Sequence, residues 1–546
     1  MPAGVRGHAH RTVPVKLALM GQAELLIIGL FVAVAGLSAL ARRLSVPYPI
    51  VLVLGGALFG FIPGVPAFRL DPNVVLIVFL PPLLYGAAFF ANLTDIRRNL
   101  RGVTLSSVGL VLATMAGVAA VAHAIVHGLP WGAAFALGAV VSPTDPLAGA
   151  TIMRRLEFPR FLVSAVEAEG LFNDATALVA YKVAVAAVVG GSFSLLSAGW
   201  HFLAGAIGGV AIGLAVGWIV AEIRKRTEDA QISITISLFS GYAAFIPANE
   251  LGASGVLAAV TTGIYMGIRG PSIIPARTRL EGFFVWEMLT FIINASLFVL
   301  VGLQLRTVVD RLSGEPAARL AGYAAAISAV VIAMRLAWFF TVPYLIRALD
   351  RRPSQRARRI GARPRLVLAW SGTRGSVSLA AALALPLTTH AHSPFPDRDL
   401  IVFLTFAVIF ATLVIQGLSL PALIRGVGVA RDGSEDEEEI RARLTATRAA
   451  LDQIDELAAE DWTHEDTLDR MRRLYEYRKR RFAARAGKIE DDGYEDRSLA
   501  YQQVVQAVLA AQREALVRMR NGGEISNETM NHVIRELDLE ESRLEI

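Results

Sequence analysis

Long apolar stretches, each close to twenty residues, recur along this chain from about Leu25 to Leu423. A helix needs about 20 residues to cross the ~30 Å hydrocarbon core of a bilayer. Hydrophobic residues make up 54% of the chain and its mean hydropathy is +0.50, both higher than is usual for a soluble protein of 546 residues. The pattern predicts an all-α polytopic membrane protein.

We expect about thirteen transmembrane helices. The predicted spans are residues 22–41, 46–64, 72–91, 102–127, 131–153, 161–188, 196–223, 231–248, 253–268, 282–304, 317–347, 364–388 and 399–424.

Loop charges predict the orientation of these spans. Loops after odd-numbered spans carry 22 Lys and Arg residues, eight of them between Arg347 and Arg365, whereas loops after even-numbered spans carry 5. Basic loops stay in the cytoplasm, so the first set is predicted to be inside. The N-terminus is then outside, despite Arg6, Arg11 and Lys16, and the C-terminal tail is inside. We expect the cell membrane as the location, with no cleaved signal peptide.

Charge also divides the chain into parts. Residues 431–546 hold 28 acidic and 19 basic residues, a net charge of −9, and the rest carries +15. We predict an external segment over 1–21, a transmembrane domain over 22–425 and a cytoplasmic, mainly helical tail over 426–546. The basic surplus lies in loops between spans, which argues against nucleic acid as a partner. The tail reads as amphipathic helices, either a regulatory or dimerising element or a solvated appendage.

The fifth predicted span is interrupted by Ser142-Pro143-Thr144-Asp145-Pro146. Two prolines remove amide donors and should open the helix inside the membrane. Unwound backbone is tolerated there only where it lines a cavity or is buried in protein, and its carbonyls and the Asp145 carboxylate are hard oxygen ligands for a small cation. The alternative is a simple kink, with Asp145 capping the second half-helix.

The sixth span carries Glu169, Asn173 and Asp174. Glu169 and Asn173 are four residues apart and share a helix face. Asp174 lies near mid-span with no basic residue within one turn, and charged groups at such depth are rarely idle. It can hold a proton or, when ionised, a dehydrated cation, which is the competition an exchanger requires. The alternative is a protonated Asp174 that bonds a neighbouring helix.

The twelfth span is interrupted at Gly372-Thr373-Arg374-Gly375. Arg374 cannot lose its charge, so it needs a buried partner, and Glu169 is the predicted one, in a structural ion pair. Two unwound spans, in the fourth-to-sixth and eleventh-to-thirteenth groups, predict an inverted repeat with crossing half-helices. Opposite charges at the crossing would also offset the facing helix dipoles.

Weaker candidates lie in other spans. Arg335 and Glu287 could form a second structural bridge. Asn294 and Ser296 are expected to make interhelical hydrogen bonds. His123 and His127 lie at an outer helix end, where solvated histidines are the expectation and a pH-sensing role is the alternative.

Several motifs together resemble the first cation:proton antiporter family, the sodium/proton exchangers. The resemblance covers roughly residues 22–425 and rests on Leu80-Pro-Pro-Leu-Leu-Tyr85, Ser142-Pro-Thr-Asp-Pro146, Glu169-Gly-Leu-Phe-Asn-Asp174, Leu297-Phe-Val-Leu-Val-Gly-Leu-Gln304 and Gly372-Thr-Arg-Gly-Ser-Val-Ser-Leu379.

This resemblance implies a homodimer in which each subunit has a dimerisation part and a mobile core. Asp174 would exchange sodium and protons, and Thr144, Asp145 and Asn173 would line or stabilise that site, with Asp174, Asp145 and Thr144 as the ligands of the transported Na⁺. Glu169 and Arg374 would form the stabilising pair. An Asn at position 173 goes with electroneutral exchange in this family.

Two departures bear on ion preference. Several relatives have an acid where this chain has Gly86, and many have Ser where it has Gly170. The loss of two oxygen ligands leaves potassium or lithium harder to exclude.

The sequence therefore predicts a secondary antiporter, not an enzyme, that exchanges Na⁺ for H⁺ by alternating access around Asp174. No cofactor is expected beyond the transported Na⁺ and H⁺, because the glycine-rich stretches lack the phosphate-loop pattern. The alternative is a K⁺ or Li⁺/H⁺ antiporter of the same fold. A cation channel, which should carry a filter loop, and a membrane sensor with the tail as output are the rivals from other classes.

Overall fold

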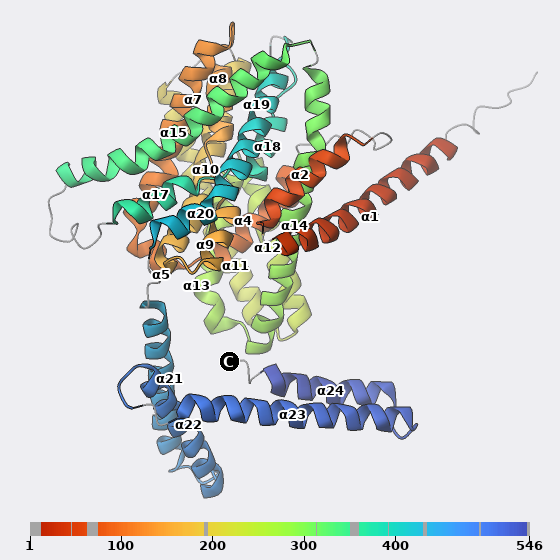
Figure 1. The fold of residues 1–546 in the computed structure, drawn as a ribbon, viewed down its shortest axis with the longest axis vertical. Coiled ribbons are helices and arrows are strands. Elements are labelled where there is room, and N and C mark those ends of the chain that lie inside the picture. Colours follow the sequence, from red (N-terminus) through yellow and green to blue (C-terminus); the bar gives the residue numbers. More distant parts are fainter. Residues whose placement is uncertain are drawn as a thin grey trace, which may run out of the picture. The chain divides into compact units, whose positions relative to one another are not determined.

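The computed structural model describes residues 13–44, 46–62, 75–190, 195–312, 314–349, 360–390, 393–429, 434–490 and 493–542. These residues are almost entirely helical, and the only β-type pairing among them is an isolated bridge between Thr388 and Pro394. The chain divides into two compact units, Met1–Arg431 and Asp432–Ile546. Figure 1 shows the helices of both units in sequence colours.

The first unit contains the apolar helices. Their bounds are α1 Val13–Leu44, α2 Tyr48–Gly60, η1 Val75–Phe79, α4 Leu80–Phe89, α5 Leu93–Arg98, α6 Leu100–Thr104, η2 Leu105–Leu110, α7 Val111–Ile125, α8 Trp131–Val141, α9 Pro146–Arg155, α10 Arg160–Gly190, α11 Leu195–Lys225, α12 Ala230–Glu250, α13 Gly255–Ile273, α14 Ala276–Arg311, α15 Ala317–Leu349, α17 Ala362–Trp370, α18 Ser376–Leu383, α19 Arg398–Ala411, η3 Thr412–Gln416 and α20 Gly417–Val427.

Each predicted span contains helix over residues that the structure describes, which confirms the all-α membrane fold. Seven helices among the described residues are long and apolar enough to cross a bilayer, and α2 and the η1–α4 segment are shorter apolar helices. The number thirteen stays a prediction. The first helix begins at Val13, earlier than the predicted residue 22, and residues 1–12 of the predicted external segment lie outside the described part.

The two predicted interruptions are present. Helix α8 ends at Val141, and α9 begins at Pro146, whose missing amide hydrogen suits the first position of a helix. Helix α17 ends at Trp370 and α18 begins at Ser376. The residues between each pair of half-helices are buried or half-buried, so this unwound backbone lies within the protein.

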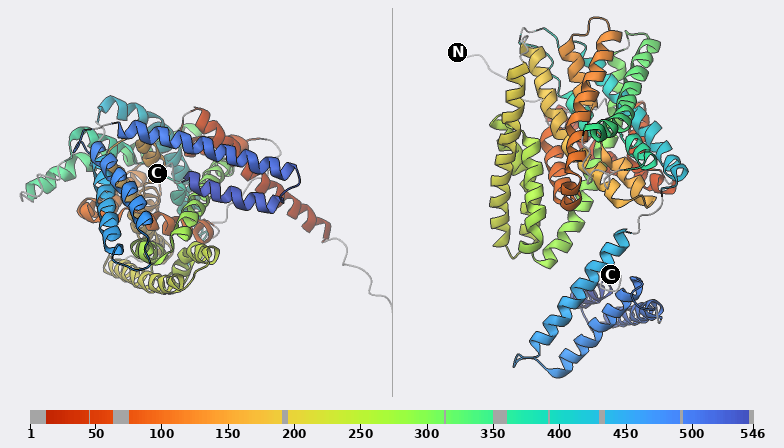
Figure 2. Two further views of the ribbon diagram at one scale, coloured as in Figure 1. Left: turned by 90° about the horizontal axis from the view of Figure 1, so that it is seen from below. Right: turned by 90° about the vertical axis from the view of Figure 1, so that its left-hand side faces the viewer.

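Small residues bring the helices of this unit close together. The Cα of Gly302 in α14 lies against the backbone of Val53 and Gly56 in α2, and Gly138 in α8 lies against the backbone of Met115 in α7. Close backbone approach through glycine is typical of helix packing inside membranes. The long helices of this unit run side by side in the right-hand view of Figure 2.

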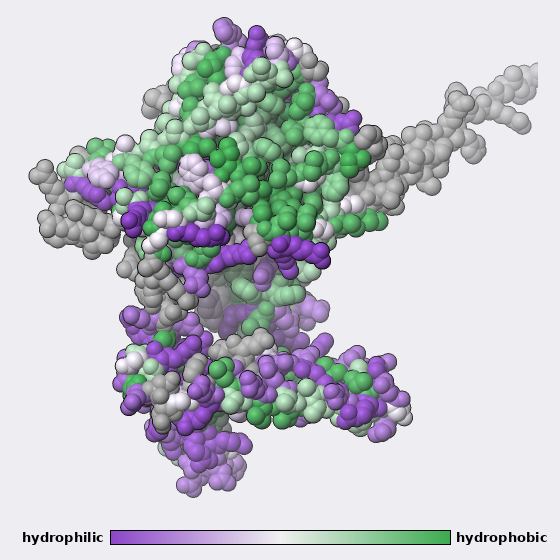
Figure 3. Space-filling model, in the orientation of Figure 1, coloured by the Kyte–Doolittle hydropathy of each residue, from purple (hydrophilic) through white to green (hydrophobic). Residues whose placement is uncertain are grey.

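The surface of the first unit is divided by polarity. On the face drawn in Figure 3, hydrophobic residues cover its middle and hydrophilic residues gather at its two ends. Large apolar side chains are exposed on this unit, among them Trp200, Trp218 and Phe239. A broad apolar belt of this kind is what a bilayer-spanning protein presents to lipid.

The second unit consists of four helices, α21 Ser434–Leu457, α22 Glu465–Arg485, α23 Tyr494–Asn521 and α24 Asn527–Ser542. Its first two helices bury Leu444, Ile454 and Phe482 between them, and its last two are joined by ion pairs of Arg513 with Asp538 and Glu541. The predicted helical tail is therefore a packed helical unit. The predicted orientation, with the N-terminus outside and the tail inside, stays a prediction.

Candidate cation site at the crossing of two broken helices

The two unwound segments are joined to each other directly. The backbone N–H of Asp145 donates to the carbonyl of Thr373 at 2.8 Å, and the Thr373 hydroxyl donates to the carbonyl of Asp145, also at 2.8 Å. Backbone groups freed by the missing helical turns therefore find partners across the crossing, as they must where no water competes.

Opposite charges offset the four half-helix ends at this crossing. The Asp145 carboxylate accepts the backbone N–H of Leu147 at 2.9 Å, which caps α9. It also lies so close to the N-cap residue of α18, Gly375, that a Cβ placed there would overlap Asp145 Oδ2. Arg374 donates from Nε to Val141 O at 3.0 Å, the C-terminal end of α8, and from Nη1 to Gly372 O after α17. The acid thus faces positive helix ends and the base negative ones, as predicted.

Glu169 pairs with Arg335, and this corrects the predicted ion pair with Arg374. Arg335 of α15 donates from Nη1 to Glu169 Oε1 of α10, and both side chains are buried. The prediction was wrong because carbonyls of the broken helices already hold the Arg374 guanidinium. The suggested bridge between Arg335 and Glu287 is wrong as well, since Glu287 is exposed on α14.

A chain of hydrogen bonds extends from this ion pair to the middle of α10. Asn173 Nδ2 donates to Thr144 Oγ1 at 2.7 Å, and Thr144 Oγ1 donates to Glu169 Oε1 at 3.2 Å. Asn173 and Thr144 are 2% and 5% exposed, so these bonds lie in a dry environment. Asn173 therefore supports the unwound segment from behind, and it does not line the cavity described next.

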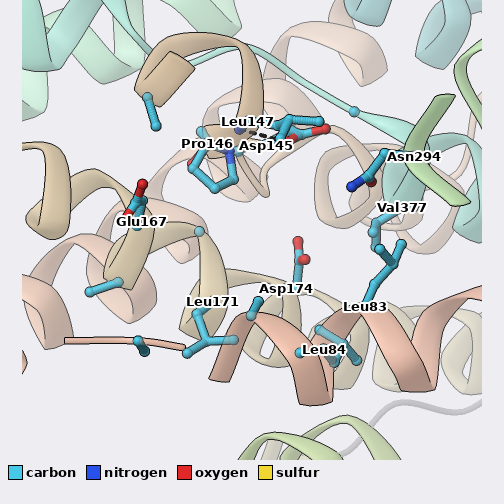
Figure 4. A pocket seen from close by; sticks show the side chains of 18 of the residues that line it. Leu83, Leu84, Asp145, Pro146, Leu147, Glu167, Leu171, Asp174, Asn294 and Val377 are labelled. Atoms are coloured by element: carbon cyan, nitrogen blue, oxygen red, sulfur yellow. Dashed lines mark hydrogen bonds between the residues drawn. The ribbon is translucent and has the colours of Figure 1, made fainter. Parts of the chain in front are cut away.

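A central cavity of about 380 Å³ lies beside the crossing. Asp174 and Asp145 line it together with Thr144, and in Figure 4 the Asp174 carboxylate points from α10 into this space. Asn294 of α14, predicted only to make an interhelical hydrogen bond, lines another wall. Beside the crossing, the cavity therefore collects the carboxylates of Asp174 and Asp145, the Thr144 hydroxyl and the Asn294 amide.

One end of the central cavity is lined by residues close to helix termini. They include Asn92, Ile96, Arg154 and Glu167. Arg154 donates to Glu167, and the two side chains are 67% and 36% exposed, so this ion pair lies at the mouth. Among the described residues that line the cavity, Arg154 is the only basic one, and its guanidinium is paired with Glu167. The inner part around Asp174 thus has carboxylates without a cationic partner.

Gly86 and Gly170, where the resemblance led us to expect a missing ligand side chain, both lie against a neighbouring side chain. A Cβ on Gly86 would come within 2.9 Å of the Trp286 ring, whose Nε1 donates to Ser237 Oγ at 3.1 Å. A Cβ on Gly170 would come within 2.5 Å of the Pro146 ring. A tryptophan and a proline therefore occupy space that a ligand side chain would need at these positions.

Sequence reasoning did not single out Thr290 and Ser378, which line the central cavity. It named Arg335 as a structural residue but gave it Glu287 as a partner in place of Glu169. Thr290 and Asn294 are four residues apart in an apolar helix, so their shared face was a readable signal. The choice between Arg335 and Arg374 carried no such signal, because both are single arginines in apolar spans.

Crossed half-helices, a buried polar network and a carboxylate-lined cavity within an apolar helical bundle define a secondary transporter for cations. The protein is therefore a transporter and not an enzyme. Comparison with known proteins identifies its family. A family model described as "Sodium/hydrogen exchanger, transmembrane" matches residues 29–426, and the chain belongs to this family.

Relatives match over most of the chain. A protein of Mycobacterium tuberculosis (strain H37Rv) named as a Na⁺/H⁺ exchanger is 36% identical over 524 residues, 95% of each chain. A "Sodium, potassium, lithium and rubidium/H(+) antiporter" of Bacillus subtilis is 28% identical over 522 residues, 93% of this chain and 76% of that protein. The sodium/proton antiporter structure from Methanocaldococcus jannaschii at pH 8 shares the fold, with a TM-score of 0.57 at 18% identity over 75% of this chain and 100% of that one.

Proposed function

We propose that this protein exchanges Na⁺ for H⁺ and that Asp174 is the carboxylate for which the two ions compete. The observation that carries the proposal is the position of Asp174, which points into the central cavity, where Asp145, Thr144 and Asn294 supply oxygen atoms and no unpaired basic side chain lies among the described lining residues. A sodium ion prefers such hard oxygen ligands, and a proton neutralises the same group. Asp145, Thr144 and Asn294 are the nearby side chains that can complete the coordination.

Asp145 and Asp174 have different parts in this proposal. The Asp145 carboxylate accepts the Leu147 amide and lies at the N-terminal ends of α9 and α18, two contacts that attract negative charge. Asp174 has no hydrogen-bond donor of this kind among the described residues. One carboxylate then changes protonation in each cycle, which supports one Na⁺ for one H⁺.

The conformation of the cavity fits one end state of alternating access. Its mouth carries Arg154 and Ile96, which lie at the arginine-rich ends of their helices. Since basic loops stay inside, this mouth faces the cytoplasm in the proposed topology, with the N-terminus outside, the tail inside and the cell membrane as the location. A homodimer is the proposed assembly.

A second candidate is exchange of K⁺ or Li⁺ by the same site. The name of the Bacillus subtilis relative includes potassium, lithium and rubidium. Trp286 and Pro146 lie against Gly86 and Gly170, where two further oxygen ligands could otherwise stand. A cation surrounded by fewer protein ligands is selected less strictly, so the site would distinguish Na⁺ from K⁺ and Li⁺ less well.

The test is cation-driven proton movement in proteoliposomes, comparing wild type with Asp174→Asn. Na⁺, K⁺ and Li⁺ are added separately, with and without a clamp of the membrane potential. We expect Na⁺ to dissipate an imposed pH gradient regardless of the clamp, and the variant to be silent. If only K⁺ dissipated the gradient, the transported ion would be K⁺ in place of Na⁺, and Asp174 would remain the proposed exchange site. Wild-type exchange by Asp174→Asn would remove Asp174 from the mechanism.

A further inference from the structure

A second cavity, separate from the central one, lies between the start of the η2-containing span, α10, α15 and α17. Its volume is about 250 Å³. We name it the basic cavity. It is lined by Asn99, Arg101, Gly102, Val103, Leu105, Ser106, Phe161, Leu162, Ala165, Val166, Glu169, Trp338, Phe339, Val342, Pro343, Ile346, Arg347, Ile360, Arg365 and Leu368.

The basic cavity has an apolar wall and a cationic end. Phe161, Trp338 and Val342 are typical of the wall, which runs along α10 and α15, while Arg347 and Arg365 lie where α15 ends and α17 begins. A chain of methylene groups fits such a wall, and a phosphate fits such an end.

Arg365 is the most telling residue of this cavity. It is 4% exposed and donates from Nη2 to Ile360 O at 2.6 Å, but its buried Nη1 has no hydrogen-bond partner among the described residues. Leaving a buried donor of a charged group unpaired is costly. Its guanidinium and that of Arg347 lie 5.4 Å and 5.0 Å from the ring of Tyr344, so one aromatic ring holds two like charges close together.

The charge of the lining is unbalanced. Arg347 and Arg365 line the cationic end, and the acid among the described lining residues is Glu169, whose carboxylate is already bound by Arg335 and Thr144. The first turn of α17 also begins at Gly361 without a side-chain cap, so its amide groups favour an anion as well. An anion near Arg365 would satisfy both groups.

We propose that the basic cavity binds an anionic phospholipid, with its phosphate at Arg365 and Arg347 and an acyl chain along the wall of α10 and α15. A lipid suits the site better than a free phosphate because the wall is apolar. Helix α15 is also among the least covered spans, because only 22% of its most apolar stretch is buried, so much of this helix is open to the bilayer. The lipid would contact α10 at Glu169, which is itself a member of the ion pair that supports the cation site.

The experiment measures lipid binding to the detergent-purified full-length protein by native mass spectrometry. Phosphatidylglycerol, phosphatidylcholine and inorganic phosphate are added separately to wild type, Arg365→Gln, Arg347→Gln and the control Arg363→Gln. Arg363 is an exposed arginine of the same helix that does not line the cavity. We expect phosphatidylglycerol to bind wild type and the control alike and to bind the two cavity variants about tenfold more weakly.

A photoactivatable phosphatidylglycerol locates the bound lipid. We expect cross-links in peptides containing Phe161–Val166 or Trp338–Arg347, and their loss in Ala165→Leu, which narrows the apolar wall without changing charge. Gel filtration checks the folding of each variant. If Arg365→Gln does not fold, the two separate variants Arg347→Gln and Ala165→Leu still test lipid binding. The proposal would be overturned if the cavity variants and the control bound phosphatidylglycerol equally well. It would also be overturned if inorganic phosphate bound the wild-type protein as well as the lipid does. Binding is read without transport, so this result is independent of the antiport assay.

Discussion

Asp145 and Thr373, 228 residues apart in sequence, exchange two hydrogen bonds of 2.8 Å across the crossing of the broken helices. This pairing connects the two halves of the membrane unit at the point where both lack helical hydrogen bonds. One of the two bonds is donated by the Thr373 hydroxyl, so a substitution of that side chain measures how much this bond contributes.

Thr373→Val keeps the shape of the side chain but removes the hydroxyl. The buried carbonyl of Asp145 then loses its donor, and we expect a loss of about 1–3 kcal/mol in stability together with slower exchange. Thermal unfolding of the purified protein measures the first effect and proteoliposome flux the second. Thr341→Val is the matched control, because the Thr341 hydroxyl is exposed and bonds only within α15. Equal effects of the two substitutions would contradict the proposed importance of the crossing.

Glu169→Gln tests the ion pair that the structure assigns to Arg335. Removing one partner leaves a buried guanidinium uncompensated, and the expected cost is about 3–5 kcal/mol. Glu167→Gln, two residues away, removes the exposed pair with Arg154 and should cost at most about 1 kcal/mol. Thermal unfolding compares them. If Arg374→Gln, rather than Arg335→Gln, removes the sensitivity to Glu169→Gln in a double-mutant cycle, the pairing described here is wrong.

Gly375→Ala places a methyl group where the Asp145 carboxylate lies against the start of α18. The φ of Gly375 is −129°, so the substitution acts through space and not through backbone strain. Displacing Asp145 by about 1 Å should slow exchange roughly tenfold to a hundredfold. The control is Gly361→Ala at the start of α17, where the nearest neighbour of a Cβ, Pro364 Cδ, is 3.6 Å away. Flux assays on both variants decide, and an active Gly375→Ala would show that Asp145 tolerates displacement.

Truncation after Arg431 removes the second compact unit as a whole. The cation site and its supporting network lie entirely in the first unit, so we expect exchange to be retained within about twofold, as for a domain that carries its own core. Proteoliposome flux of the truncated and full-length chains provides the measurement. Loss of exchange in a folded truncated chain would make the tail part of the transport mechanism and favour a regulatory or sensory role.

Much of the architecture could be predicted because bilayer thickness fixes helix length and proline fixes helix breaks. Pro143 and Pro146 marked the first interruption, and the glycines around Arg374 marked the second. Asp145 and Thr144 could be predicted as cavity residues for the same reason. The partner of Glu169 could not, since it depends on which face of α15 turns toward α10. The contact between the Trp286 ring and Gly86 likewise depends on how α4 packs against α14. Residue spacing within a single span carries no information about such packing.

The pairing of Glu169 with Arg335 has an electrical consequence. The fixed charges around the site, Asp145 and Glu169 on one side and Arg335 and Arg374 on the other, sum to zero. In the proposed mechanism Asp174 is the remaining charge, so the moving part would be neutral when it carries either H⁺ or Na⁺ and would bear one negative charge when empty. Moving that unbalanced charge through a medium of low dielectric constant is expensive. An empty carrier would therefore be held in place electrostatically, which couples the two ions and suppresses leakage.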